Sequence, residues 1–173
     1  LIPASMSAQQ PRGFGAASFV PPPGWAVDSR PAMEMFTRIR GPHRCMVLVS
    51  GQEPANGTLD AAFRRVWAAA FTPSTYRRAD RPTSVEQLSP AGYRHAVGEG
   101  PLEDRAGNQF VVRLHVFPVG QNIQSVVLLG TSRAALDDCR EDWNTFFASL
   151  RFRSVESESG RAAGARAEAP SAA

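Results

Sequence analysis

Three strand-like segments that follow one another closely constrain the fold of this chain more than any other feature. Residues 93–99, 108–119 and 123–130 are rich in apolar and β-branched side chains, and turn-forming residues lie at 104–108 and 120–122. Segments joined by short turns pair as antiparallel hairpins, because a parallel connection needs a crossover of a dozen or more residues. The chain therefore predicts a largely antiparallel sheet and excludes a Rossmann-type alternation.

Two segments show the three-and-four spacing of an amphipathic helix. The first begins at a cap on Thr58, has Asp60 in its first turn and ends before Pro73. The second begins at Thr131 or Ser132 and runs to Leu150. Each has one apolar stripe that must be buried against the sheet. The stripes are Leu59, Ala62, Phe63, Val66, Trp67, Ala70 and Phe71 in the first helix, and Leu136, Cys139, Trp143, Phe146 or Phe147, and Leu150 in the second.

Shorter strand-like segments complete the order of elements. They are residues 18–20, 25–27, 33–40 and 45–50 before the first helix, and 151–153 after the second. The stretch 73–90 is polar and contains three prolines, which predicts irregular structure. Strands, a helix, three strands, a helix and a strand predict the α+β class: an antiparallel β-sheet flanked by helices, as an α/β/α sandwich.

The two ends of the chain differ in composition from the middle. Residues 1–15 predict a flexible leader or the remnant of a signal peptide, because an apolar start runs into small residues and then into a polar stretch. A cloning remnant or an internal fragment would have the same appearance. Residues 16–155 predict a single domain. Residues 156–173 predict a disordered tail, because they contain no large apolar side chain.

The charge pattern argues against a nucleic-acid partner, and the apolar runs are too short for a transmembrane segment. All 19 basic residues are arginine, and 16 acidic residues leave a net charge of +3. The arginines are dispersed, with adjacent pairs only at 64–65 and 77–78, whereas nucleic-acid surfaces cluster basic and aromatic residues. The longest apolar run, residues 66–71, is far shorter than the roughly 20 residues that a transmembrane helix needs.

Histidine and cysteine positions predict no catalytic or metal site and no cofactor. His43, His95 and His115 are not spaced as zinc ligands, so each is expected at the surface or half-buried. Cys45 and Cys139 are both expected on buried faces, which disfavours a reactive thiolate. Since one lies in a central strand and the other on the helix covering it, we hypothesise a disulfide, which is possible only if the Cα atoms come within about 7 Å.

Two short motifs resemble a known family. The opening Phe19-Val20-Pro21-Pro22-Pro23-Gly24-Trp25 and the ending Trp143-Asn144-Thr145-Phe146-Phe147-Ala148-Ser149-Leu150-Arg151-Phe152 are similar to the entry and closing segments of PsbP-like proteins. The resemblance covers roughly residues 18–153 and implies an α/β/α sandwich. Its members include a subunit of the oxygen-evolving complex, a Ran-binding nuclear protein, type VI secretion effector chaperones and exported bacterial proteins. These are mostly binding and assembly proteins, so the resemblance implies a protein partner and no catalytic motif.

The function expected from these observations is an exported, periplasmic or secreted binding and assembly protein without enzymatic activity. The first alternative is a cytoplasmic type VI secretion effector chaperone. An enzyme whose site is assembled from distant loops is a second alternative, because sequence alone does not show such a site.

The segment 108–119 supplies the candidate binding residues. Phe110, Val112, Leu114 and Val116 alternate to one face and predict core. The opposite face carries Val111, Arg113, His115 and Phe117, a mixed charged and aromatic strip that predicts a partner-binding surface. The alternative is that the second helical layer covers this face and Arg113 pairs with an acid.

Overall fold

An eight-stranded antiparallel sheet forms the centre of the structure, a computed structural model that describes residues 10–153. The strand order is β3-β4-β5-β10-β9-β8-β6, and β7 pairs with β8 beside β6. The strands are β3 (Ala26–Arg30), β4 (Met33–Arg40), β5 (His43–Pro54), β6 (Tyr76–Ala79), β7 (Val85–Leu88), β8 (Arg94–Asp104), β9 (Gln109–Val119) and β10 (Asn122–Gly130). The hairpins of β8, β9 and β10 that the sequence predicts are confirmed.

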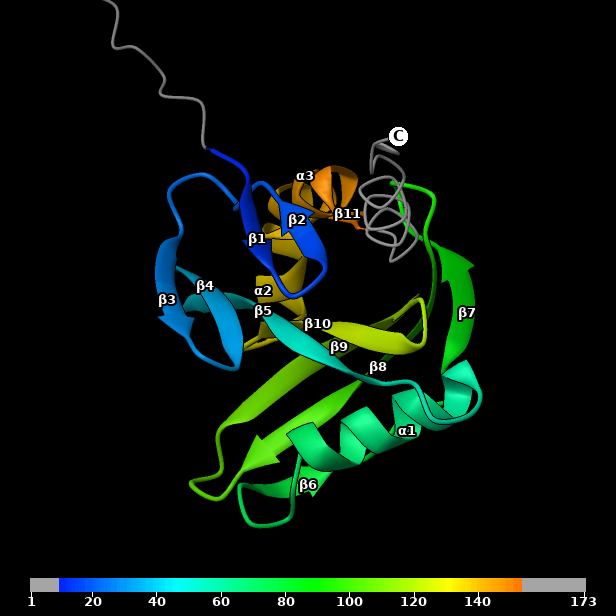
Figure 1. The fold of residues 1–173 in the computed structure, drawn as a ribbon. Coiled ribbons are helices and arrows are strands. Elements are labelled where there is room, and N and C mark those ends of the chain that lie inside the picture. The colour runs from blue at the N-terminus through cyan, green and yellow to red at the C-terminus, as the bar shows by residue number, and fades with distance from the viewer. Residues whose placement is uncertain (1–9, 154–173) are drawn as a thin grey trace, which may run out of the picture.

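Helices cover the sheet from both sides, which confirms the predicted α/β/α sandwich. Figure 1 shows α1 (Leu59–Ala70) on one face, and α2 (Arg133–Asp138) with α3 (Arg140–Ser149) on the other. A small sheet of β1 (Arg12–Phe14), β2 (Ala17–Phe19) and β11 (Arg151–Phe152) lies beside α3. Within residues 10–153, no helix combines the length and apolar character needed to cross a membrane.

The α1 face is a closely packed apolar layer. Thr58 caps the helix as predicted, since its hydroxyl accepts the Ala61 N–H at 3.2 Å. The α1 stripe, apart from the exposed Ala70, packs on Val112, Leu114 and Val116 of β9, all fully buried. This confirms the predicted core side of that strand except at Phe110, which is half-buried. Gly98 of β8 permits this approach, because a Cβ at that position would lie 2.7 Å from the Phe63 ring.

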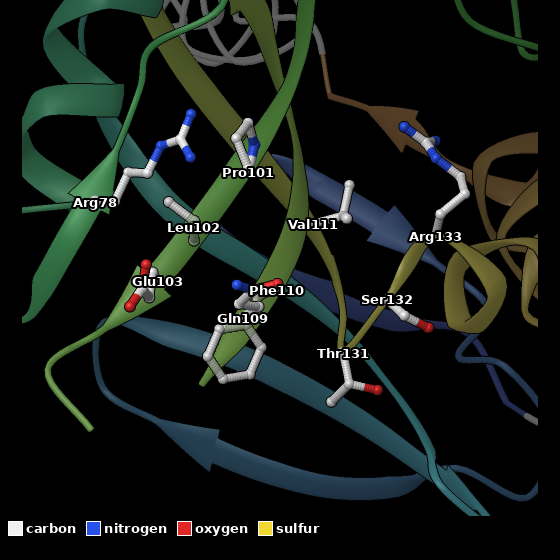
Figure 2. Close-up of a pocket in the computed structure, with 10 residues that line it drawn as sticks. All are labelled: Arg78, Pro101, Leu102, Glu103, Gln109, Phe110, Val111, Thr131, Ser132 and Arg133. Carbon is white, nitrogen blue, oxygen red and sulfur yellow. The ribbon is translucent and has the colours of Figure 1, made fainter. Parts of the chain in front are cut away.

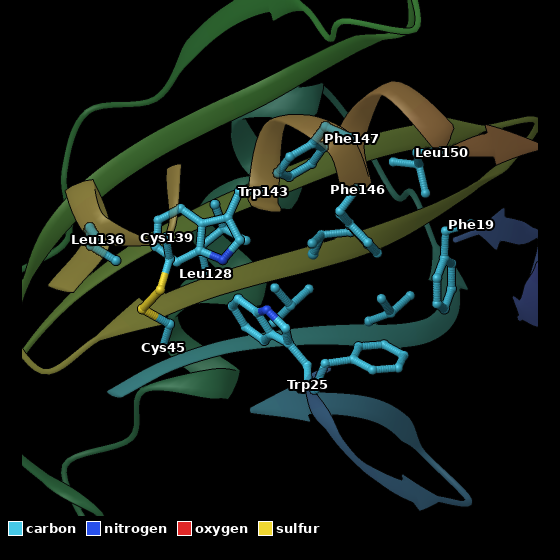
Figure 3. Close-up of a cluster of buried hydrophobic side chains, with 14 of the residues drawn as sticks. Phe19, Trp25, Cys45, Leu128, Leu136, Cys139, Trp143, Phe146, Phe147 and Leu150 are labelled. Carbon is cyan, nitrogen blue, oxygen red and sulfur yellow. A yellow bond between two sulfur atoms is a disulfide. The ribbon is translucent and has the colours of Figure 1, made fainter. Parts of the chain in front are cut away.

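The second helical segment is broken in two, which corrects the prediction of one continuous helix. Cys139 ends α2 and precedes α3, with backbone angles of φ −99° and ψ 3°. The predicted stripe is nevertheless buried, because residues on both sides of the break face the same core (Figure 3). Cys139 is bonded to Cys45 of β5 there, with their Cα atoms 6.7 Å apart.

Three further expectations differ from the structure. The stretch expected to be irregular contains β6 and β7, short strands that lie along β8. Strand β8 continues five residues beyond its predicted end at Glu99, to Asp104, and this extension contains Pro101. Neither β6 nor β7 pairs with β8 at Pro101, so the missing N–H of the proline is tolerated there. Residues 12–14 of the predicted leader form β1. Residues 1–9 and the predicted tail 156–173 lie outside the described residues.

Candidate functional site

The helices do not cover the whole of their sheet face, and the uncovered part lies over β8 and β9. On this face Glu99 of β8 is the cross-strand neighbour of Arg113 of β9, and Pro101 is the neighbour of Val111. Arg113 and Val111 are half-buried and Pro101 is exposed. The uncovered strip is therefore short and partly exposed, it contains both charged and apolar side chains, and it is bordered by α2 and α3.

Two cavities open along this strip. The larger, about 410 Å³, lies between β7 and α3 and has Leu88, Trp143 and Phe147 on its walls and His95 and His115 among its other lining residues. We call it the β7–α3 cavity. The smaller, about 290 Å³, lies where β8 and β9 meet the start of α2. Figure 2 shows Arg78 and Arg133 on opposite sides of this hollow.

A carboxylate with two arginines joins the two cavities. Arg113 donates from Nε and Nη2 to Oε2 of Glu99 at 2.9 and 2.7 Å, and Arg133 donates to Oε1 of the same side chain. Burial alone raises the pKa of Glu99, but the hydrogen bonds from Arg133 and Arg113 outweigh it and lower the pKa below its ordinary value. Arg113 lines the larger cavity and Arg133 the smaller, so this ion triad lies between them. We call the two cavities and the triad together the groove.

Two buried histidines lie at the inner side of the larger cavity. The rings of His95 and His115 stack with centroids 5.1 Å apart, and Phe147 of α3 covers His115 at 4.5 Å. Within residues 10–153 no hydrogen-bond partner is found for either ring nitrogen of His115, for Nε2 of His95 or for Nε1 of Trp143. These nitrogens are also closed to solvent. The site therefore keeps polar atoms in an apolar environment, which is costly to stability and common at functional sites.

Burial determines the protonation state of this pair. It lowers the pKa of His95, an effect that the backbone of Tyr93, whose carbonyl lies 3.3 Å from Nδ1, and the backbone of Gln87 offset in part. It lowers the pKa of His115 well below its ordinary value, and the neighbouring His95 and Arg113 lower it further. Both rings are therefore neutral at about pH 7.

The structure separates the four residues of the predicted binding strip. Phe117 is fully buried and His115 is 6% exposed, because Phe147 and Phe152 pack over them. Phe117 is therefore not part of a binding surface, because the second helical layer covers it as the alternative proposed, and His115 contributes only to the inner wall of the β7–α3 cavity. Arg113 and Val111 remain at the border of the groove, and Arg113 pairs with an acid.

The other residues singled out from the sequence lie outside the groove. Cys45 and Cys139 form their disulfide in the core, where it attaches the junction of α2 and α3 to β5 (Figure 3). His43 lies at the start of β5, 3.7 Å from Asp138. Among the described residues, no three His, Cys, Asp or Glu side chains gather where they could hold a metal ion.

Sequence reasoning missed several residues of the groove. Glu99 had a usable signal, because it lies in one strand of the predicted hairpin, and the observed register of that hairpin pairs it with Arg113. Leu88 of β7 had none, since all four residues of that strand are exposed and show no alternation. Arg140 and Trp143 were assigned to a helix, but nothing in their spacing indicates that β7 lies opposite them.

The fold places the chain in a known structural class. No protein-family model matches the chain, and no curated protein matches it. In solved structures, however, the sandwich described above recurs in PsbP-like proteins, which confirms the resemblance at the level of the fold.

Three solved structures illustrate the likeness. The Ran-binding protein Mog1p of Saccharomyces cerevisiae superposes with a TM-score of 0.55 at 8% identity, over 86% of this chain and 98% of that one. CyanoP, the PsbP of Synechocystis sp. PCC 6803, superposes with a TM-score of 0.52 at 12% identity, over 88% of this chain and 97% of CyanoP. A protein from Bacteroides thetaiotaomicron VPI-5482 superposes with a TM-score of 0.53 at 9% identity, over 86% of this chain. This chain spans about half (50%) of the length of that protein. Identities this low show a shared fold alone.

Proposed function

We propose that this protein is an exported, non-enzymatic binding protein that engages a protein partner through the groove. The observation that carries the proposal is the triad of Glu99, Arg113 and Arg133, which lies between two cavities on an uncovered part of the sheet. Arginine is enriched at the centres of protein interfaces, and a shared carboxylate holds both guanidinium groups in place. The groove thus offers oriented charge beside apolar walls.

The edge of the sheet beside the groove supports the same proposal. Val85 and Leu88 of β7 are 61% and 68% exposed, and they belong to an edge strand. An exposed apolar edge strand is an aggregation hazard unless a partner covers it. The fold also supports protein binding in at least one other chain, since Mog1p is described as a Ran-binding protein.

The disulfide supports export over the alternative of a cytoplasmic effector chaperone. Disulfides form and persist in oxidising compartments and are rare in the cytosol. The bond of Cys45 to Cys139 is buried in the core, as a structural bridge would be. Alkylation of cells that are acid-quenched and denatured should therefore leave both cysteines unmodified until the protein is reduced. Labelling of both cysteines before reduction would contradict export.

Site-specific photo-crosslinking tests the binding surface. Benzoylphenylalanine is introduced at Leu88, beside the groove, or at Ile39 on β4, which is equally exposed at 69% but lies toward the other edge of the sheet. In the native organism the crosslinker at Leu88 should give a discrete protein adduct, and the Arg113→Glu change should abolish that adduct. Any adduct from the crosslinker at Ile39 should be unaffected by the Arg113→Glu change. Equal adducts from both positions, or none from Leu88, would overturn the proposed surface.

A further inference from the structure

The walls of the β7–α3 cavity favour a compact apolar group. Its volume of about 410 Å³ falls in the ordinary range of small-ligand sites. Leu128, Trp143 and Phe147 supply apolar surface from the sheet and α3, and Leu88 supplies it from β7 on the other side. A flat aromatic or short aliphatic group has apolar surface to contact on both walls.

The charges at the cavity favour a negative ligand. Its lining residues include Arg113 and Arg140 and no aspartate or glutamate. Both arginines have carboxylate partners just outside the lining, Glu99 for Arg113 and Asp137 for Arg140. Because Glu99 is shared by Arg113 and Arg133, the triad keeps one unit of positive charge. A cationic ligand is therefore disfavoured.

We propose that the β7–α3 cavity binds an apolar group that carries a carboxylate, with Arg113 and Arg140 receiving the charge. A planar carboxylate matches the donor geometry of guanidinium groups. Arg113 holds Glu99 through Nε and Nη2, and no hydrogen bond from its Nη1 to a described residue is found, so this nitrogen is left for a ligand. Asn144 adds an amide to the lining.

The proposal rests on the proposed function and names the chemistry that the groove recognises. The carboxylate has two possible sources: a free acid, or an acidic side chain two positions from an aromatic one in an extended segment of the partner. Residues two apart share one face of a strand, so such a segment would present both groups to the cavity together. The two sources require separate arms of the experiment.

Calorimetric titration with matched probes tests the charge requirement. Phenylbutyrate is compared with phenylbutanol, and a blocked pentapeptide with phenylalanine and aspartate two positions apart is compared with its asparagine counterpart. At least one acidic probe should bind about tenfold or more tightly than its neutral match. Preference in the first pair alone identifies a free acid, preference in the second alone identifies a partner segment, and either supports the proposal. Equal binding within both pairs, or no binding at all, overturns it.

Paired arginine variants test the location. Arg113→Gln with Arg140→Gln should abolish the preference for the acid, whereas the exposed arginines of the control, Arg44→Gln with Arg64→Gln, should leave it unchanged. If the first variant fails to fold, Arg140→Gln is used alone, because it leaves the Glu99 triad intact. It should weaken binding of the acidic probe by severalfold. A preference that survives in the folded double variant overturns the assignment. If only the ligand class is wrong, the crosslink from Leu88 remains; if the proposed function is wrong, that crosslink is absent.

Discussion

The two faces of the central sheet bury different kinds of side chain. On the α1 face the buried polar groups have partners: Trp67 Nε1 donates to the Ala79 carbonyl at 3.2 Å, and Ser125, the cross-strand neighbour of Val116, has its hydroxyl 2.7 Å from that of Ser50. The α2–α3 face buries a disulfide, two neutral histidines and the unpartnered N–H of Trp143. The same sheet therefore has one face with its polar atoms satisfied and one that retains unsatisfied groups.

This difference indicates where stability and function reside. Burying an unpaired polar group costs free energy, so such groups persist where something other than stability retains them. The unsatisfied nitrogens belong to residues that line the β7–α3 cavity, and the groove lies on the same face. The α1 face acts as the stable support, and the α2–α3 face carries the candidate site.

The largest effect is expected from removing the disulfide, which holds the α2–α3 layer to β5. Its cysteines are separated by 94 positions in the sequence, for which the chain-entropy model gives about 4.7 kcal/mol. The double variant Cys45→Ala, Cys139→Ala should lose that much free energy of unfolding in guanidinium titrations. The reduced wild-type protein serves as the control and should lose a similar amount. A loss below about 1 kcal/mol would show that the α2–α3 layer does not depend on this bond.

Acid should weaken the histidine-bearing face before it protonates Glu99. Because burial holds the pKa of His95 and His115 below 6.5, the unfolded chain binds protons that the folded chain does not. Stability is then fully present above about pH 6.5 and falls as the pH decreases below it, by up to about 2.7 kcal/mol per pH unit for two protons. The pKa of Glu99 is lowered from 4.5, so loss of its contribution begins only at lower pH.

Urea unfolding at several values between about pH 7.5 and about pH 5 measures this slope. His115→Phe keeps a flat ring against Phe147 and removes one titrating group, so the slope should fall by about half. Unchanged stability between about pH 6.5 and about pH 5.5 would mean that the histidines take up protons in the folded state.

The sequence predicted the elements that consist of apolar residues in a clear pattern and are bounded by turn or capping residues. The hairpins of β8 to β10 and the start of α1 at Thr58 followed directly from periodicity and turn residues. Strand β7 was missed because none of its four side chains is buried, so no alternation exists to detect. The break at Cys139 was missed because the apolar stripe continues across it.

The candidate site was predictable only in part, for a related reason. Alternation in β9 assigned Arg113 and His115 correctly to the same face. Alternation does not indicate how far a helix extends over that face. In the structure α3 covers His115, which is buried, but leaves Arg113 half-buried. The wall formed by Leu88 depends on the pairing of β7 with β8, a contact between segments that no local pattern specifies.

A smaller effect is expected from overpacking the α1 face. Gly98→Ala places a Cβ 2.7 Å from the Phe63 ring and 2.9 Å from Pro82, so atoms in a closely packed layer must move. A cost of about 2 kcal/mol is typical of such overpacking. Gly51→Ala is the matched control, because its nearest atom is the Ala32 carbonyl oxygen at 3.9 Å. Melting of the two variants at equal concentration should separate them, and a tolerant Gly98 would show that the α1 face is looser than its contacts indicate.

The smallest effect is expected from the same substitution, tryptophan to phenylalanine, made once on each face of the sheet. Trp67→Phe and Trp143→Phe remove the same atoms from side chains that are 2% and 4% exposed, so the loss of apolar burial is comparable. Trp67→Phe also removes the hydrogen bond to the Ala79 carbonyl, whereas Trp143→Phe removes an N–H that has no partner among the described residues. A lost hydrogen bond costs about 1 kcal/mol, and relief of a buried unsatisfied donor returns a similar amount. The free energy of unfolding should therefore fall by about 1–2 kcal/mol more in Trp67→Phe than in Trp143→Phe. Equal losses in urea titrations would mean that the Trp143 N–H is satisfied in solution, and the contrast between the two faces would then rest on the histidines alone.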